Sequence, residues 1–235
     1  MKKMMSLLAL AVVGSVAAAS AAETEVLSAN AVGYVKKSVQ GGQLMPFVMP
    51  FDLLNSDVTD GIQFIKMQLA DELDVGSEVY FWSGANWVRT YKDEDEGEVE
   101  WIGPANTKKL NYGEMFFVKP STDGEYTLAG EVPDGATTQV QMLGKGTLNA
   151  VGYPYPTPIK FAKTELFEKA PIGTQVYFWS GSNWVRSYKD EDEGEVEWIG
   201  PANTKELEPG EGFFVQFPGD EGLTAWEQSK PYEWP

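Results

Sequence analysis

A segment of 29 residues occurs twice in this chain, and the two copies are almost identical. Residues 79–107 match residues 176–204 at 27 of 29 positions. Self-similarity at a fixed spacing is the signature of a repeat architecture. The chain is therefore expected to contain two tandem structural repeats, 97 residues apart.

Two alignments extend the repeat toward the N-terminus. Residues 30–34 read NAVGY and recur at 149–153, a spacing of 119 that leaves 22 residues missing from the second copy. Residues 42–44 instead match 146–148 at a spacing of 104, which leaves seven residues missing. We prefer the second alignment, treat the NAVGY pair as coincidental, and place the missing residues in the helix-like stretch at 62–73.

Short aromatic and β-branched segments, separated by Gly, Pro, Asn and Asp, predict a chain made mostly of strands. Residues 79–82 and 87–92 flank the turn-like Ser-Gly-Ala-Asn and predict a hairpin. The acidic residues 93–98 are expected to turn the chain again. Further strands are expected at 99–102, 114–119 and 125–132.

One short helix is predicted in the first copy, from about Asp60 to Leu73, with Asp60 as its candidate N-cap. Residues 160–168 of the second copy stand in its place. Strands this short and closely spaced indicate an all-β fold of two tandem β-sandwich or partly open barrel repeats. The repeats are expected to span residues 23–135 and 136–235.

Residues 1–22 have the pattern of a secretory signal peptide. Lys2 and Lys3 precede a short apolar core, and Ala19-Ser20-Ala21 forms a cleavage site. The alternative is an N-terminal anchor helix. No second apolar run of about 18 residues follows, so we expect no membrane insertion after the signal is removed. The expected location is the bacterial envelope, either periplasmic or secreted.

The composition excludes several classes of function. Without Lys2 and Lys3, 35 acidic residues remain against 16 basic ones, a net charge of −19. Such a charge repels nucleic acid and anionic membrane surfaces. The chain also lacks both cysteine and histidine, which excludes Ser-His-Asp and Cys-His catalysis and nearly all zinc, copper and haem sites. Carboxylate chemistry, lysine chemistry and oxygen-bound hard cations remain.

Three segments together resemble a known repeat. These are TLNAVGYPYPTPI at residues 147–159, the hairpin VYFWSGSNWVRSY, and LEPGEGFFV near the end of the second copy. They are similar to a β repeat of secreted Gram-negative proteins with the pattern GNPYP, then IYxWxG, then PGxGFFV. The resemblance covers most of the mature chain and implies a β module outside the cytoplasm, with no known reaction. The first copy departs from the pattern, with YGEMFFV in place of PGEGFFV.

The first candidate site is a strand with alternating aromatic side chains. Trp87, Arg89 and Tyr91 share one face of such a strand, and an arginine between aromatic rings is expected to stack on them. The functional interpretation is a sugar-stacking platform that appears twice; the structural one, which we prefer, is an aromatic ladder that stabilises the sheet. The corresponding residues of the second copy are Trp184, Arg186 and Tyr188.

The second candidate site is the acidic segment between the predicted strands. Calcium prefers several carboxylate oxygens, and the spacing of Asp93, Asp95 and Glu96 is similar to that of a calcium loop, although its register does not fit an EF-hand. The alternative, which we prefer, is a turn exposed to solvent. We therefore expect no cofactor and keep calcium binding as a hypothesis to test. The second copy carries Asp190, Asp192 and Glu193.

These features favour a non-catalytic protein with a structural or interaction role in the cell envelope or extracellular matrix. Its partner would be a polysaccharide or an envelope protein. The alternative is a carbohydrate-binding module that uses the paired Trp-Arg-Tyr strands, with assistance from calcium. We do not expect an enzyme, because nothing in a charged loop raises the pKa of one carboxyl. Four further tryptophans are predicted to anchor the cores: Trp82, Trp101, Trp179 and Trp198.

Overall fold

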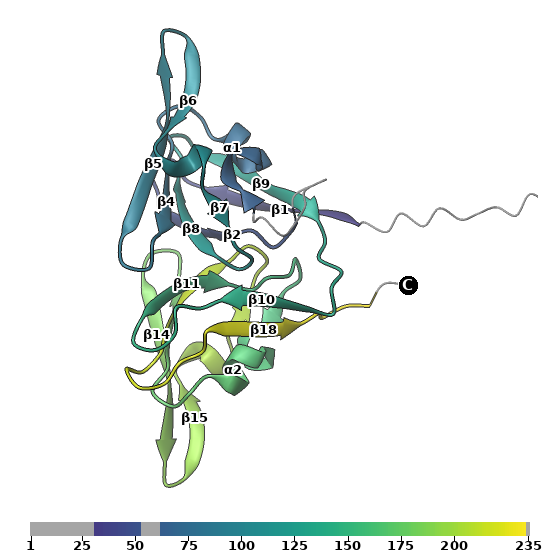
Figure 1. Ribbon diagram of the computed structural model, residues 1–235, viewed down its shortest axis with the longest axis vertical. Coiled ribbons are helices and arrows are strands. Elements are labelled where there is room, and N and C mark those ends of the chain that lie inside the picture. Colours follow the sequence, from purple (N-terminus) through teal and green to yellow (C-terminus); the bar gives the residue numbers. More distant parts are fainter. Residues whose placement is uncertain (1–30, 53–61, 234–235) are drawn as a thin grey trace, which may run out of the picture.

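The computed structural model describes residues 31–52 and 62–233, and they form two similar halves that lie end to end (Figure 1). Each half contains one five-stranded antiparallel sheet, smaller two-stranded ribbons and one short α-helix. The predicted all-β fold with two repeats is confirmed. Within the described residues no helix is long and apolar enough to cross a bilayer.

The five-stranded sheets have the same strand order in both halves. In the first repeat the order is β2 (Met45–Val48), β8 (Met115–Lys119), β4 (Glu78–Trp82), β5 (Trp87–Asp95) and β6 (Glu98–Ile102). In the second repeat it is β11 (Leu148–Gly152), β17 (Gly212–Gln216), β13 (Gln175–Trp179), β14 (Trp184–Asp192) and β15 (Glu195–Ile199).

The remaining strands form two-stranded ribbons. They pair β1 (Val32–Val39) with β9 (Gly124–Glu131), β10 (Thr137–Gln141) with β18 (Ala225–Ser229), β3 (Ile62–Gln63) with β7 (Lys109–Leu110), and β12 (Ile159–Lys160) with β16 (Glu206–Leu207).

Each half also has short helices. They are the 3₁₀ turns Phe64–Lys66, Pro104–Asn106, Phe161–Lys163 and Pro201–Asn203, and the α-helices α1 (Gln68–Glu72) and α2 (Glu165–Lys169).

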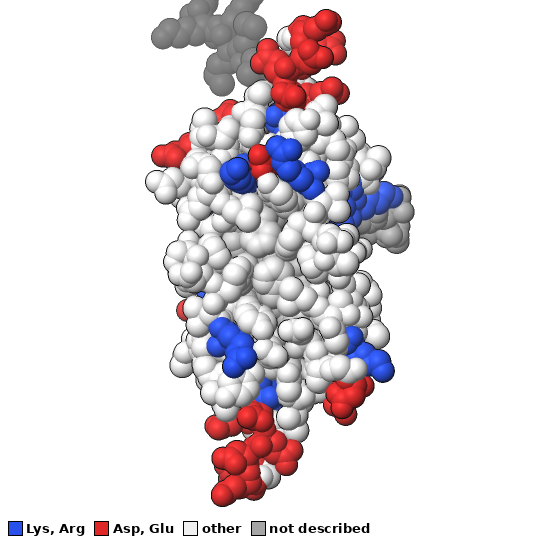
Figure 2. All heavy atoms as spheres, turned by 90° about the vertical axis from the view of Figure 1, so that its left-hand side faces the viewer, with Lys and Arg blue, Asp and Glu red and all other residues white. Residues whose placement is uncertain are grey.

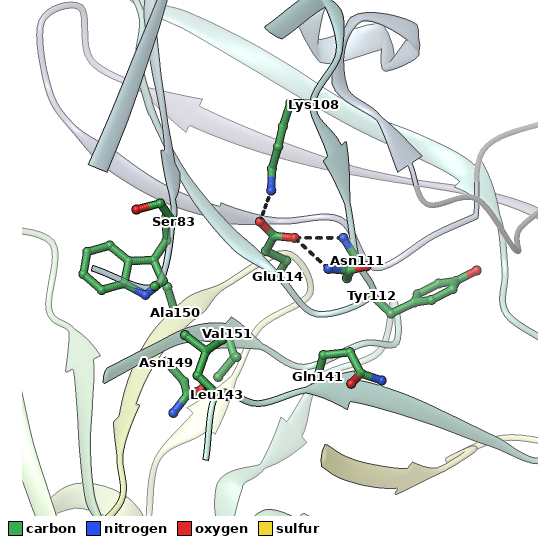
Figure 3. A pocket seen from close by; sticks show the side chains of 12 residues that line it. Ser83, Lys108, Asn111, Tyr112, Glu114, Gln141, Leu143, Asn149, Ala150 and Val151 are labelled. Carbon is green, nitrogen blue, oxygen red and sulfur yellow. Dashed lines mark hydrogen bonds and ion pairs between the residues drawn. The ribbon is translucent and has the colours of Figure 1, made fainter. Parts of the chain in front are cut away.

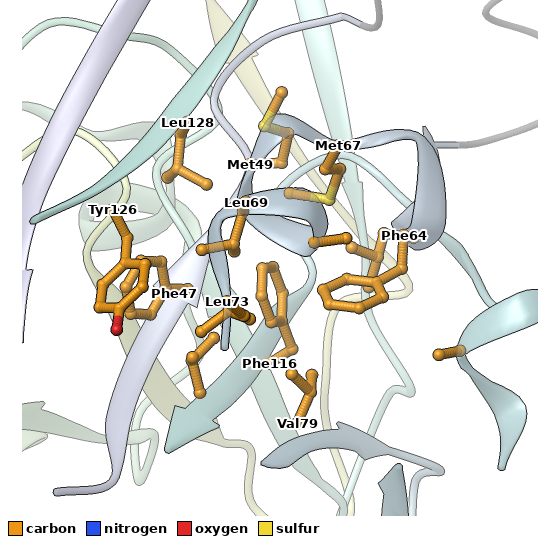
Figure 4. Close-up of a cluster of buried hydrophobic side chains, with 14 of the residues drawn as sticks. Phe47, Met49, Phe64, Met67, Leu69, Leu73, Val79, Phe116, Tyr126 and Leu128 are labelled. Atoms are coloured by element: carbon orange, nitrogen blue, oxygen red, sulfur yellow. The ribbon is translucent and has the colours of Figure 1, made fainter. Parts of the chain in front are cut away.

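A separate aromatic core fills each repeat between the sheet, the ribbon and the helix (Figure 4). Phe64 lies at the centre of the first core, where its ring makes edge contacts with Phe81 at 5.3 Å and Trp101 at 5.2 Å. Phe161 makes the matching contacts in the second core, with Phe178 at 5.2 Å and Trp198 at 5.6 Å. Because β-strand side chains alternate, the same strands leave a second aromatic face outside each core.

A lysine ties each long hairpin to its helix. The Lys92 ammonium donates to the carbonyl oxygens of Ala70, Asp71 and Leu73 at the end of α1, at distances of 2.7–3.2 Å. Lys189 does the same at the end of α2. A cation there satisfies carbonyls that have no partner inside the helix and interacts well with the helix dipole. Both copies therefore require lysine at this position for structural reasons.

The strand pairing confirms the spacing of 104 for the start of the repeat. Phe47 pairs with Phe116 and Val151 pairs with Phe213, so β2 and β11 are equivalent strands. The NAVGY pair is not equivalent, because its first copy runs into β1 of a ribbon and its second copy lies in β11 of a sheet.

Three details of the sequence prediction are wrong. The seven extra residues of the first repeat fall between β2 and β3, before the helix, because α1 and α2 keep the spacing of 97. Each repeat, and not the first alone, has a short helix; the predicted cap Asp60 lies outside the described residues. The acidic segment is also mostly strand, since β5 continues to Asp95 before it turns.

The two repeats join through a pair of matching backbone contacts. The Val48 amide donates to the Gly210 carbonyl at 3.0 Å, and the Gly152 amide donates to the Gly113 carbonyl at 2.8 Å. Val48 is equivalent to Gly152, and Gly113 is equivalent to Gly210, so each bond is the symmetry counterpart of the other. The junction therefore has the self-complementary form of a two-fold dimer interface. A third apolar cluster is buried at this junction, formed by Val48, Met115, Phe117, Ala150 and Phe214.

Glycine is required where the two backbones approach most closely. A Cβ on Gly152 would lie 2.5 Å from both the Glu211 carbonyl oxygen and Cγ2 of Val48. One contact is with backbone and the other is with a fully buried side chain. Moving either neighbour away would therefore destabilise the fold. The repeats would have to separate to admit even one methyl group.

We expect Gly152→Ala to destabilise the whole chain by about 1–3 kcal/mol, the usual cost of overpacking a well-filled site. Urea unfolding followed by tryptophan fluorescence measures the change. Gly219→Ala is the matched control, since a Cβ there meets no atom within 4 Å, and its stability should remain close to that of the parent. Equal stability of the two variants would contradict the role given to the junction.

Lys37 is a second unusual feature of the junction. Its ammonium donates to the Pro46 carbonyl at 3.1 Å and to the Gly210 carbonyl at 2.9 Å, and it lies 4.7 Å from the centre of the Phe47 ring. Burial of the ammonium lowers the pKa of Lys37 to about 8, and the Glu211 carboxylate opposes part of this shift. The charged form is thus costly in the folded chain.

Between pH 8 and about 10.5 the unfolded chain binds more protons at Lys37 than the folded chain does, so the free energy of unfolding should rise over this range. We expect a rise of roughly 2 kcal/mol. This is less than the usual 1.4 kcal/mol per pKa unit would give, because the Lys37 side chain is partly exposed. Urea unfolding at several pH values should show the rise in the parent and its absence in Lys37→Met.

Lys36→Met is the control for this experiment. Lys36 is exposed and pairs with Glu125 at 2.6 Å, so its removal should leave the rise above pH 8 intact. A parent protein whose stability is flat across the range would contradict the burial of the Lys37 charge.

Candidate binding face and inter-repeat cavity

The predicted Trp-Arg-Tyr residues lie on the outer face of the sheet. Across the hairpin, Trp87 pairs with Trp82, Arg89 with Tyr80, and Tyr91 with Glu78. The face therefore includes more aromatic residues than the strand alone suggested. The second repeat builds the same face with Tyr177, Trp179, Trp184, Arg186 and Tyr188.

The predicted stacking of arginine on an aromatic ring is present in both repeats. The Arg89 guanidinium lies 4.5 Å from the centre of the Tyr91 ring, and that of Arg186 lies 4.9 Å from Tyr188. Arg89 also donates to the Glu78 carboxylate at 3.0 Å. Hydrogen bonds from Arg89 and Tyr80 hold the pKa of Glu78 below its ordinary value.

The second repeat has a neutral acceptor in place of the Glu78 carboxylate. Gln175 stands where Glu78 stands in the first repeat, and it accepts from Tyr177 at 2.8 Å and from Arg186 at 3.4 Å. Lys119, which lies 3.7 Å from Glu78, is likewise replaced by glutamine. One negative and one positive charge are lost together, so the two faces keep the same net charge.

The aromatic faces of the two repeats meet at the junction and form one band. Trp87 packs on Phe117 of its own repeat at 4.8 Å and on Phe214 of the other at 6.1 Å. Trp184 contacts Phe214 at 4.6 Å and Phe117 at 6.2 Å. Both tryptophans are only partly buried. The two platforms predicted from sequence are thus parts of one aromatic face. It is named here from its partly exposed rings: Tyr80, Trp82, Trp87, Tyr91, Tyr177, Trp179, Trp184 and Tyr188.

The charge on this side of the molecule is segregated (Figure 2). The centre of this side is uncharged, lysine and arginine side chains lie above and below it, and most of the acidic side chains in view gather at the two extremes. Those extremes are the tips of the β5–β6 and β14–β15 hairpins (Figure 1). The aromatic face therefore carries little of the strong negative charge of the chain.

The residues predicted to bind calcium lie on these hairpins. Asp93 faces Glu100 and Asp95 faces Glu98 across the strands, while Glu96 and Gly97 form the turn with positive φ of 52° and 84°. Asp190, Asp192 and Glu193 are arranged in the same way. Among the described residues, no three Asp or Glu side chains come together closely enough to hold a metal ion. The acidic groups are instead spread along both strands.

The prediction for the four tryptophans is half right. Trp101 and Trp198 are buried in the cores, with 8% and 3% of their surface exposed. Trp82 and Trp179 lie on the outer aromatic face instead, because they follow Phe81 and Phe178, which point into the cores. The alternation of residues 79–82 is the signal that could have placed them.

A cavity of about 320 Å³ lies between the repeats, beside the aromatic face (Figure 3). Trp82, Lys108, Asn111 and Glu114 of the first repeat line it, and Gln141, Asn149 and Val151 of the second repeat close it. None of these positions except Trp82 stands out in the sequence, because the cavity exists only where two repeats meet.

An ion pair forms the polar wall of the cavity. The Lys108 ammonium and the Glu114 carboxylate are 2.5 Å apart, with 23% and 16% of their side chains exposed. Glu114 also accepts from the backbone amide of Asn111 at 3.0 Å and from its side-chain amide at 3.3 Å. The wall is therefore polar and fixed in position, and the charges of the pair cancel.

The matching place on the other side of the junction is occupied by lysine. Val140 packs over Gly113 beside the cavity, whereas at the equivalent position Leu128 packs most closely over Gly210 and the Lys37 side chain lies beside it. The same ion pair is present there, between Lys205 and Glu211 at 2.5 Å. The two-fold symmetry of the junction is thus broken at this point.

No family model, curated protein or solved structure matches this chain. The geometry of the aromatic face and of the cavity is therefore the basis for assigning a function.

Like charges face each other across the acidic hairpin, which costs stability. We expect Glu98→Lys, which places lysine opposite Asp95, to stabilise the hairpin by about 0.2–1 kcal/mol. Amide hydrogen exchange of the β5–β6 hairpin at low salt measures the effect.

Glu94→Lys is the control, since residue 94 faces Val99 and the same change of net charge creates no cross-strand pair. Equal protection in both variants would show that net charge, and not the facing pair, decides the stability of the hairpin.

Proposed function

We propose that this protein is a non-catalytic interaction protein of the cell envelope or extracellular matrix, exported by the signal peptide expected at residues 1–22. One observation carries the proposal: strands of both repeats join into a single aromatic face with an uncharged centre. Exposed aromatic area held on rigid strands is typical of binding surfaces. The resemblance of the sequence to repeats of secreted proteins supports the location.

The carboxylates around this cavity support a non-catalytic role for it. Burial raises the pKa of Asp52 to about 6, but Asp52 is not among the residues that line the cavity. Glu114 is the one carboxylate in the cavity wall, and it is paired with Lys108. Carboxylate catalysis of glycoside hydrolysis needs two such groups facing one substrate.

Carbohydrate is the second candidate, and it is the partner that the aromatic face favours. Sugar rings pack their apolar faces on aromatic side chains, and their hydroxyls bond to charged and amide groups nearby. Arg89 and Arg186 stand beside tyrosine rings with their guanidinium groups in solvent. A polymer that contacts both repeats at once would gain from their fixed spacing.

The test is binding of the mature chain to an array of glycans and purified envelope polysaccharides, with and without millimolar calcium. We expect the double variant Tyr91→Ala, Tyr188→Ala to lose most binding, since about 1–3 kcal/mol is a usual contribution of a stacked aromatic ring. Both tyrosines lie on the outer face, away from the two cores.

The control is Asp93→Asn with Asp190→Asn, which changes the hairpins and leaves the aromatic face intact. Loss of binding in the control alone would move the site to the acidic hairpins, and dependence on calcium would then assign them a cation. Absence of binding to every glycan and envelope polysaccharide would overturn the carbohydrate candidate, and an envelope protein would remain as the partner.

A further inference from the structure

We propose that the cavity between the repeats binds one neutral sugar residue at the end of a glycan chain, and that each protein chain holds one such site. The proposal rests on the carbohydrate candidate above and names the subsite that gives it specificity. It is drawn from the size of the cavity, from the chemistry of its wall and from the broken symmetry of the junction.

The size of the cavity fits a single small ring. Sites for small molecules have volumes of about 300–1,000 Å³, and this cavity, at about 320 Å³, lies at the lower end. Several rings in succession would exceed it. The cavity therefore suits the terminal residue of a chain, whose remaining residues extend outside.

The wall of the cavity selects a neutral polar ligand. Lys108 and Glu114 cancel each other's charge, so neither an anion nor a cation is favoured. A carboxylate has about four acceptor positions and an ammonium has three donors, so both groups can bond to a ligand while they stay paired. Hydroxyl groups both donate and accept, which fits this wall and the amides of Asn111 and Gln141.

An indole completes the recognition of a sugar. Trp82 lines the cavity, and its ring lies 5.0 Å from that of Trp87 on the aromatic face. The Trp82 N–H is occupied, because it donates to the Leu148 carbonyl at 3.0 Å, which fixes the ring in place. The cavity therefore adjoins the aromatic face, and a glycan that enters with its terminal ring continues onto Trp87.

The broken symmetry limits the chain to one site. At the equivalent position on the other side of the junction, the Lys37 ammonium bonds to the Pro46 and Gly210 carbonyls. In addition, the Gln43 side chain donates to the Gly181 carbonyl at 3.1 Å. A sugar would have to displace these groups, so two nearly identical repeats yield one specific subsite.

The experiment is titration of the mature protein with neutral oligosaccharides chosen from the array, by calorimetry, with free monosaccharides as competitors. We expect one glycan per chain and competition by the monosaccharide that matches the chain end. Glu114→Gln should weaken binding at least about tenfold, as expected for loss of a hydrogen bond to a charged group. Glu211→Gln, which changes the matching ion pair beside Lys37, should bind as the parent does.

A second variant keeps the test valid if Glu114→Gln folds poorly. Gln141 is exposed at the end of β10, so Gln141→Ala should fold normally and bind more weakly. Binding unchanged in both cavity variants, or two glycans per chain, would overturn the subsite while the aromatic face stands. Loss of binding confined to the tyrosine double variant would overturn the subsite in the same way. No glycan binding by the parent would overturn the carbohydrate candidate itself.

Discussion

The junction between the repeats is the contact on which the rest of this structure depends. Each repeat has its own aromatic core, but the second aromatic face of each sheet can be covered only by the other repeat. The backbones approach so closely there that Gly152 has no room for a side chain. The chain lacks disulfides, so burial of apolar surface must hold the two halves together. The aromatic face and the cavity both exist because this contact forms.

Much of this fold follows from the sequence alone. The duplicated segment establishes two repeats, and alternation along residues 79–92 places the hairpin and assigns one face to Trp87, Arg89 and Tyr91. The same alternation, applied to residues 79–82, would have placed Trp82 outside the core. Helices as short as α1 and α2 are hard to predict, because five residues span little more than one turn and give almost no periodic signal.

The cavity could not be predicted in this way. Its residues come from the β4–β5 turn, the loop before β8, and two strands of the other repeat, and no short stretch of sequence brings them together. The difference between its two sides involves Val140 on one side and Lys37 and Leu128 on the other, in parts of the repeat where the copies have diverged. Near-identity in the middle of each copy therefore conceals a structural difference that the divergent ends create.

The two acidic hairpins place like charges at the opposite poles of the molecule, and the waist between them is uncharged on the side that Figure 2 shows. Two molecules that approach pole to pole repel each other at distances up to about a Debye length, 8–10 Å in physiological salt. Approach waist to waist meets no such barrier. The duplication of an acidic hairpin thus acts on how neighbouring molecules are oriented: it disfavours end-to-end contact and leaves the aromatic side accessible.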